Sequence, residues 1–122
     1  AYFPKDVLTD RSVRFIVSEI IREKIFKRYK KEIPYSSEVV VESFKEKEKI
    51  IEINCIVYVE RTSQKGILIG KNGTALTSLG TAARRDIQNF LEKKVFLGLY
   101  VKVLKDWKKK NIDLKKFGYI KK

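Results

Sequence analysis

The chain has 122 residues, which is enough for one domain built on a single core. Hydrophobic residues make up 43% of the sequence and no run of 18 apolar residues occurs, which argues against disorder and against a transmembrane helix. The N-terminal residues lack the pattern of a signal peptide. With 28 Lys and Arg against 15 Asp and Glu, the formal net charge is +13, which favours a polyanionic partner, most often nucleic acid, over a merely solubilising charge.

The numbers of cysteine, histidine and methionine residues further limit the kinds of site that the chain can form. The single cysteine, Cys55, excludes a disulfide within the chain and a Cys-rich metal site, and we expect it to be a buried small hydrophobic residue. The chain has no His, the commonest general base and metal ligand. These features fit a reducing, cytoplasmic setting. The chain starts at Ala1 and contains no Met, so we expect a domain cut from a longer protein.

The first half predicts one helix and a hairpin. Apolar residues at helical spacing predict a helix over residues 10–30, and Pro34 in EIPYSS is expected to mark a loop. A β-branched run predicts a strand over 37–44, and the charged segment 45–49 predicts a hairpin loop. Strict alternation predicts a second strand over 50–60, with the odd-numbered apolar residues Ile51, Ile53, Cys55, Val57 and Val59 on one face.

The second half adds two helices and a strand. A short helical turn is predicted over 63–69, and a helix from about Thr74 to Glu92. Gly80 inside that helix costs roughly 1 kcal/mol against Ala, so we expect a neighbouring backbone to approach it closely. A third strand is predicted over 94–105. The tail up to residue 122 is dense in lysine, and we expect a short helix there that docks its aromatic residues.

The segment GKNG at 70–73 lies between the two predicted helices and invites three interpretations. A nucleotide-binding P-loop requires G-x-x-x-x-G-K-[ST], but Gly66 and Gly70 are one residue too close and Asn72 stands where a hydroxyl is needed. This interpretation is therefore rejected. A plain turn between helices remains open, because glycine is ordinary in turns.

The third interpretation is a clamp for a nucleic-acid backbone. Gly70 and Gly73 lack a Cβ, which would let a phosphate approach closely, and the following helix offers free N–H groups to an anion. Lys71 adds positive charge and Asn72 adds donors. A G-x-x-G loop that joins two helices is the feature by which KH domains grip about four nucleotides of a single strand. The basic composition favours this interpretation over the plain turn.

The chain resembles a known family at this point. The predicted order α-β-β-α-α-β with G-x-x-G between the middle helices is similar to a type II KH domain, an α+β fold whose three-stranded sheet is covered on one face by helices. The segments EIIREKIF (19–26), EIPYS (32–36) and GILIGKNG (66–73) resemble the C-terminal KH domain of the bacterial Era GTPases. The resemblance spans nearly all of residues 1–122.

The resemblance implies a function, partners and a set of RNA-binding residues. It implies binding of the single-stranded 3′ end of small-subunit ribosomal RNA during assembly of the small ribosomal subunit, by a monomer without catalytic activity of its own. GTP and Mg²⁺ would belong to a missing upstream domain, and the full-length protein would be cytoplasmic or peripheral to the inner face of the cell membrane. The clamp maps to Gly70, Lys71, Asn72 and Gly73. An apolar floor is expected from Ile69, Leu76 and Ile67, although Ile67 fits the core better, and added charge from Lys65, Arg84 and Arg85.

Three alternatives stay open beside this interpretation. The chain resembles Era in the helix EIIREK, but another KH protein, such as a ribosomal protein or a transcription factor, would carry the same loop with a different RNA. A docking module would instead use the lysine-rich tail, residues 105–122, to bind an acidic protein or a membrane. An enzyme is disfavoured, because no nucleophile and base form a recognisable pair. For Arg84 and Arg85, a merely solvated helix face is the alternative role.

Overall fold

The computed structural model describes residues 10–30 and 32–106. The chain forms, in order, α1 (Asp10–Arg28), α2 (Glu32–Ser36), β1 (Glu38–Glu46), β2 (Ile51–Val59), α3 (Thr62–Ile69), the short 3-10 helix η2 (Lys71–Gly73), α4 (Thr74–Leu91) and β3 (Val95–Val103). The predicted order of helices and strands is confirmed, with α2 and η2 as additional short elements.

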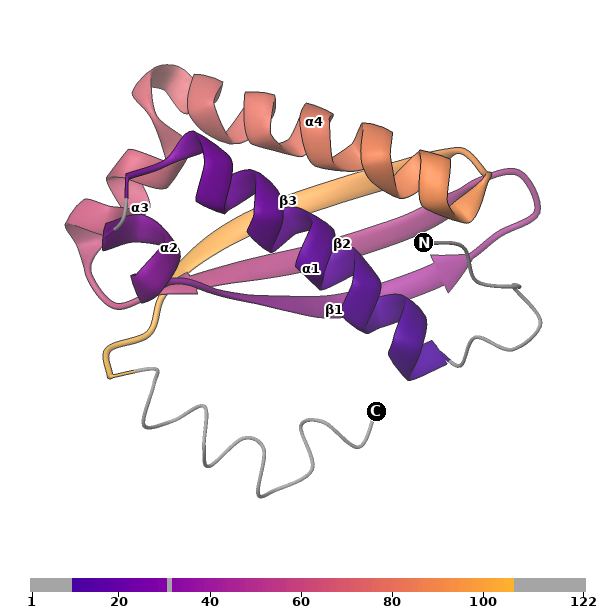
Figure 1. Cartoon of the computed structure of the whole chain (residues 1–122), viewed down its shortest axis with the longest axis horizontal. Coiled ribbons are helices and arrows are strands. Elements are labelled where there is room, and N and C mark those ends of the chain that lie inside the picture. The colour runs from indigo at the N-terminus through magenta and orange to yellow at the C-terminus, as the bar shows by residue number, and fades with distance from the viewer. Residues whose placement is uncertain (1–9, 31, 107–122) are drawn as a thin grey trace.

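The strands form one three-stranded sheet with β2 in the centre. β1 and β2 pair antiparallel as a hairpin, while β2 and β3 pair in parallel, from Ile51 beside Val95 to Val59 beside Val103. The parallel pair requires a crossover, and α3, η2 and α4 supply it. Figure 1 shows α1 and α4 lying side by side over the same face of the sheet. The α+β architecture with helices on one face is confirmed.

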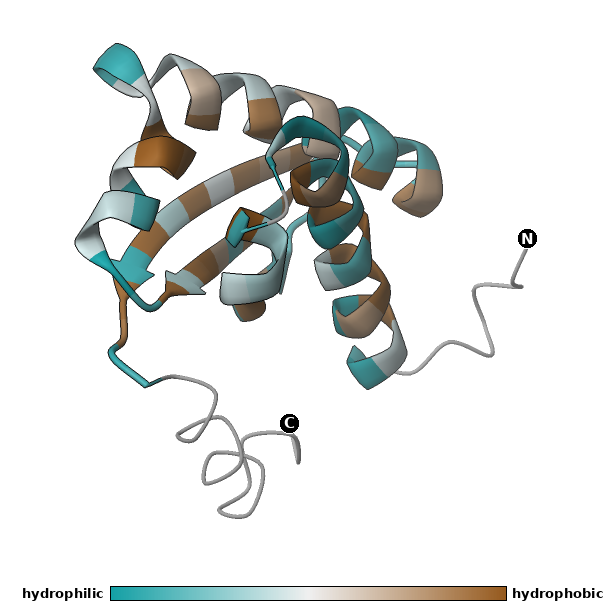
Figure 2. Cartoon of the chain, turned by 60° about the vertical axis from the view of Figure 1, so that its left-hand side comes forward, coloured by the Kyte–Doolittle hydropathy of each residue, from teal (hydrophilic) through white to brown (hydrophobic). Residues whose placement is uncertain are grey.

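The core lies between this sheet face and the helices. The odd-numbered residues of β2 that the sequence pattern assigns to one face are all buried, and Cys55 among them is fully enclosed. The helices contribute Val17, Ile21 and Ile25 from α1 and Leu79, Ala83 and Ile87 from α4. Figure 2 shows hydrophobic residues alternating with more polar ones along the strands. Burial raises the pKa of the Cys55 thiol to about 12, against a smaller opposing effect of the positive charge of Arg14.

Several predicted boundaries differ from those of the structure. Pro34 lies inside α2 and does not mark a loop. It occupies the first turn of that helix, where an N–H has no intrahelical partner and its loss costs nothing. β1 extends to Glu46, so the hairpin turn is shorter than predicted, and it is closed by a bond from the Lys47 N–H to the Ile50 carbonyl at 2.9 Å. The predicted C-terminal helix lies outside the described residues.

Candidate nucleic-acid interface

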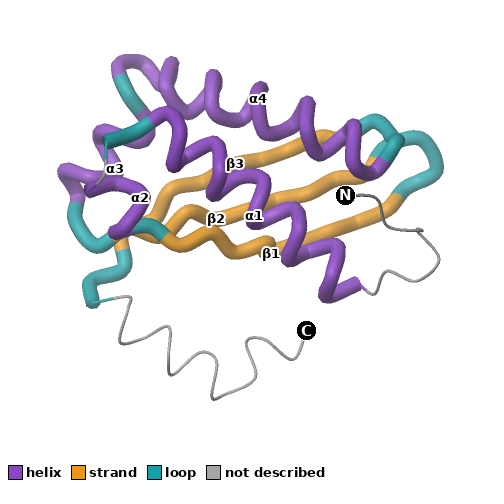
Figure 3. The backbone as a smooth tube through the Cα atoms, viewed as in Figure 1, coloured by secondary structure: helices purple, strands orange, loops and turns teal. Residues whose placement is uncertain are grey.

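The GKNG loop has a backbone that only particular residues adopt. Gly70 has φ 76° and ψ 179°, a region that is essentially restricted to glycine. Asn72, with φ 55° and ψ 27°, and Gly73, with φ 76° and ψ 9°, are left-handed, where Gly and Asn are the favoured residues. The segment is therefore a sharp, specified turn between α3 and α4, at the end of the molecule opposite the β1–β2 hairpin (Figure 3).

Glycine is also required at residue 70 because Ala75 lies close to it. An ideal Cβ at this position would lie 2.6 Å from the Cβ of Ala75 and 3.0 Å from its backbone nitrogen. Gly73 differs, because a Cβ there would meet no atom within 4 Å. Gly70 thus brings the end of α3 against the first turn of α4, whereas Gly73 leaves open space beside the loop.

The start of α4 presents groups that suit an anion. Its N-cap residue, Gly73, has no side chain to cap the first N–H groups of the helix. Thr74, the first residue of α4, donates both its N–H and its hydroxyl to the Lys71 carbonyl, the hydroxyl at 2.8 Å, and no side chain caps the N–H groups that follow. The side chains of Lys71 and Asn72 are exposed beside this helix end. The helix dipole, the uncapped N–H groups that follow Thr74 and a lysine charge therefore coincide at one place.

Arg28, the last residue of α1, and Tyr29, which follows it, bind the two helices that flank the loop. The Tyr29 hydroxyl donates to the Leu68 carbonyl at 2.9 Å, in the last turn of α3, where carbonyls lack helical partners. The Arg28 guanidinium donates to the Ser78 hydroxyl of α4 at 2.8 Å. Partial burial raises the pKa of Tyr29, so the phenol stays protonated as this donor. Neither α3 nor α4 can therefore shift away from the loop without breaking a hydrogen bond to Tyr29 or Arg28.

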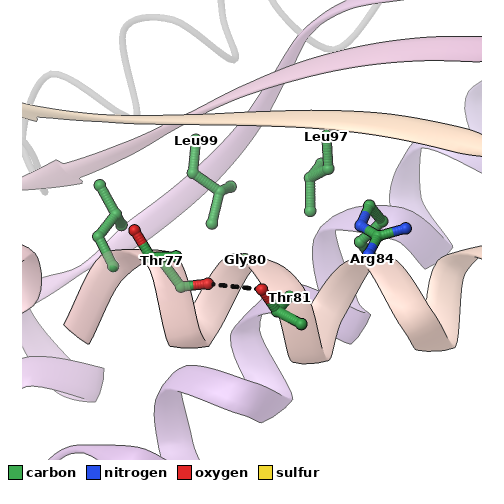
Figure 4. A pocket seen from close by; sticks show the side chains of 7 residues that line it. Thr77, Gly80, Thr81, Arg84, Leu97 and Leu99 are labelled. Atoms are coloured by element: carbon green, nitrogen blue, oxygen red, sulfur yellow. Dashed lines mark hydrogen bonds between the residues drawn. The ribbon is translucent and has the colours of Figure 1, made fainter. Parts of the chain in front are cut away.

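A pocket of about 300 Å³ lies between α4 and β3. Figure 4 shows that α4 forms one wall and β3 the other, with Leu97 and Leu99 pointing toward the helix. The walls are apolar near Leu76 and the two β3 leucines, whereas Thr77, Thr81 and Arg84 add polar groups along the helix. Leu76 follows Gly73 by three residues, so the pocket begins where the loop ends. We call the loop and this pocket together the groove.

The unpaired edge of β3 also contributes backbone N–H and carbonyl groups to the groove. The Lys94 carbonyl accepts from the Ile51 N–H at 2.9 Å and the Leu104 N–H donates to the Val59 carbonyl at 2.7 Å, so even-numbered residues bond to β2. In a parallel strand the alternate residues direct both backbone groups to the opposite side. The N–H and carbonyl of Leu97 and Leu99 are therefore directed to the edge beside the groove, where the described residues place no further strand.

Gln88 closes the far end of this edge. Its side-chain oxygen accepts from the Val95 N–H at 3.0 Å and from the Arg84 guanidinium at 3.1 Å. The first odd-numbered N–H of β3 is thereby satisfied, whereas the N–H groups of Leu97 and Leu99 have no such partner within the described residues. Gln88 also fixes Arg84 at the pocket, so the charge of Arg84 is held over the groove.

The structure brings together most of the predicted site residues. Gly70, Lys71, Asn72 and Gly73 form the loop, Ile69 precedes it, and Leu76 and Arg84 line the pocket. Lys65, which is half-buried on α3, and Arg85, which is exposed on α4, do not line the pocket.

Two expectations about individual residues are wrong. Ile67 was expected in the core, but its side chain is 50% exposed, and Leu68 is the buried residue of that apolar run. Gly80 was expected to admit a neighbouring backbone, yet a Cβ there would meet only the Leu99 side chain, at 3.6 Å.

The sequence pattern missed the β3 wall and Gln88. The second strand, β2, is the central strand and bonds to a neighbour on both sides, so it offers no free edge to RNA bases. The edge belongs to β3, whose Leu97 and Leu99 resemble ordinary core residues in the sequence. The available signal was the long helical connection between the second and third strands, which implies parallel pairing and a new sheet edge under the helix.

Comparison with known families agrees with this geometry. A family model described as a KH domain matches residues 32–108. The chain belongs to the KH domain family. It is 53% identical over 120 residues to the GTPase Era of Syntrophus aciditrophicus and 54% identical over 119 residues to that of Geotalea uraniireducens. Each match covers 97% of this chain but only 39% and 40% of the relative, so the chain spans about two fifths of their length.

Two solved structures are similar to this chain. One is a variant of Aquifex aeolicus Era bound to GDP and AlF4⁻, with a TM-score of 0.81 and 34% identity over 96% of this chain and 40% of that one. The other is Era in complex with MgGDPNP and nucleotides 1506–1542 of 16S ribosomal RNA, with the same TM-score and identity over 98% and 40% of the two chains. The resemblance to the KH domain of Era is confirmed.

None of the described helices combines the length and apolar character needed to cross a membrane. The described residues also contain no group of three or more His, Cys, Asp or Glu side chains that could hold a metal ion. The KH family is a family of nucleic-acid-binding modules.

Proposed function

We propose that this KH domain binds single-stranded RNA in the groove, and that its target is the 3′ end of small-subunit ribosomal RNA. The observation that carries the proposal is the continuity of the loop with the pocket. A phosphate held by the GKNG loop and the start of α4 places the following nucleotides over Leu76 and between α4 and β3. The Era structure in complex with nucleotides 1506–1542 of 16S ribosomal RNA supports the choice of target.

The two parts of the groove have different tasks. The loop binds the sugar–phosphate backbone, because Lys71, Asn72 and the free N–H groups of α4 offer charge and donors without base specificity. The pocket and the β3 edge discriminate bases, because the backbone groups of Leu97 and Leu99 can form hydrogen bonds with base edges in the plane of the strand. Arg84 adds a positive charge at the far end.

The biological setting follows from this target. We propose that the domain directs a longer, Era-like GTPase to the small ribosomal subunit during its assembly, in the cytoplasm and as a monomer. GTP and Mg²⁺ would be bound by the remaining part of such a protein. A peripheral membrane location stays a prediction.

The proposal is tested by fluorescence anisotropy with an RNA of nucleotides 1506–1542 of 16S ribosomal RNA and a scrambled RNA of the same length. We expect tighter binding to the genuine sequence and a logarithmic salt slope of about −0.7 for each phosphate neutralised. A salt-independent affinity would contradict the phosphate clamp. Equal affinity for both RNAs would contradict the assigned target.

A charge-matched pair of variants locates the binding. Lys71→Asp with Asn72→Asp lowers the net charge of the loop by three units, and Lys45→Asp with Lys49→Asn lowers the net charge by the same amount at the opposite end of the molecule. We expect the loop variant to lose at least about tenfold in affinity, because it replaces charge-assisted donors by repelling carboxylates. The hairpin variant should lose far less. If only removal of residues 105–122 abolishes binding, the lysine tail and not the groove is the docking element.

A further inference from the structure

Gly80 is not explained by the conformation of α4. It lies in the interior of an 18-residue helix, where glycine is a poor helix former. Among the described glycines only Gly70 and Gly73 have positive φ angles, so the backbone at residue 80 is open to any L-residue. Alanine at this position would favour the helix.

Packing within the chain does not require glycine at residue 80 either. An ideal Cβ there would have the Leu99 Cδ1 atom at 3.6 Å, an ordinary van der Waals distance, and no other atom within 4 Å. The added methyl group would enter the pocket between α4 and β3, which Gly80 lines together with Leu97, Leu99 and Arg84 (Figure 4). The missing side chain therefore creates space that nothing in the described chain fills.

We infer that Gly80 determines the depth of the groove and thereby the affinity for RNA. In this inference, one nucleobase of the bound RNA lies against the backbone of α4 at Gly80, where no side chain intervenes. This inference rests on the proposed function. The pocket has apolar walls for the faces of an aromatic ring, supplied by Leu76 and Leu99, and polar groups at its rim, supplied by Thr77 and Thr81. A flat ring with polar edges, such as a nucleobase, matches this distribution. A methyl group at residue 80 would hold the ring away from the helix.

Gly66 supplies a matched control for the experiment. It lies inside α3, a Cβ there would meet no atom within 4 Å, and it does not line the pocket. Gly66→Ala and Gly80→Ala therefore make the same chemical change in a helix, with only the second change in the groove. We expect both variants to have a higher melting temperature than the wild-type chain.

RNA affinity should separate the two variants. With the RNA of nucleotides 1506–1542, we expect Gly80→Ala to bind about tenfold more weakly or worse, since one excess methyl group in a fitted pocket has an effect of this order. Gly66→Ala should bind like the wild type. A Gly80→Ala variant that is more stable and binds equally well would overturn the inference, and so would equal losses in both variants.

An RNA with one abasic nucleotide at each position in turn completes the test. At the position whose base lies at Gly80, removal of the base should weaken binding to the wild type but leave the affinity of Gly80→Ala almost unchanged. If no position shows this coupling, the inference is wrong. If the wild type does not bind the RNA, or if the Lys71→Asp, Asn72→Asp variant binds it as well as the wild type does, the proposed function is contradicted instead. The two failures are thus distinguishable.

Discussion

The central strand β2 and the GKNG loop are governed by different physical constraints. In β2, every second side chain is enclosed between the sheet and the helices, and any residue of suitable volume and hydrophobicity satisfies the position. In the loop, the side chains of Lys71 and Asn72 are exposed, and the constraint acts on backbone angles and on the space beside Gly70 and Gly73. Changes in the strand should therefore affect stability first, whereas changes in the loop should affect binding first.

The largest expected effect is that of Ile53→Ala in β2. The Ile53 side chain is fully buried, so its truncation should lower the free energy of unfolding by about 2–5 kcal/mol through lost burial and a cavity. Ile67→Ala makes the same change at a half-exposed position of α3 and should cost less than about 1 kcal/mol. Urea unfolding of both variants measures the difference. Similar losses would show that burial in β2 is not what stabilises the domain.

The contrast between strand and loop also explains which features the sequence could predict. The alternation in residues 51–59 is a local pattern that reports burial directly, and the two glycines around Lys71 and Asn72 report backbone geometry directly. Both were predictable. The apolar run at 67–69 was not, because in a short helix the choice between Ile67 and Leu68 as the buried residue depends on how the helix is oriented against the sheet.

The β3 wall of the groove was hidden for a different reason. Leu97 and Leu99 follow the same alternation as the core residues of β2, and only the pairing of strands far apart in sequence places them at an edge beside α4. Gln88 was equally hidden, since its partners Arg84 and Val95 come together only when that edge lies under the helix. Local periodicity identifies a buried face, but it does not identify which strand ends the sheet.

Gly70→Ala is expected to have the next largest effect and to act on both properties. The new Cβ would collide with Ala75 and the residue would be forced into a glycine-only conformation, so we expect a loss of about 1–3 kcal/mol in stability. RNA affinity should fall by at least about tenfold, because the first turn of α4 is displaced from the loop.

Gly73→Ala separates the two causes, because this position has the same φ of 76° but open space around the Cβ. Its stability loss should be smaller than that of Gly70→Ala. Denaturant unfolding and anisotropy measurements on both variants test this order. Equal losses of stability would mean that the contact with Ala75 contributes nothing and that the backbone angle alone demands glycine.

The smallest expected effect comes from the thiol of Cys55, and it should act on stability alone. Burial raises the pKa of Cys55 from 9.0 to about 12, so between these values the unfolded chain loses the thiol proton while the folded chain keeps it. The folded state then binds more protons, and the free energy of unfolding falls as the pH rises, by at most about 1.4 kcal/mol per pH unit. Below pH 9 this contribution is constant.

Cys55→Ala isolates the contribution of the thiol, because every other ionisable group is common to the two proteins. The variant should be less stable than the wild type at pH 7 because it leaves a small cavity, and the gap should narrow as the pH rises above 9. Unfolding by urea at a series of pH values measures this gap. Parallel curves would show that the thiol titrates equally in the folded and unfolded states, and hence that the centre of β2 is more accessible to water than its full burial implies.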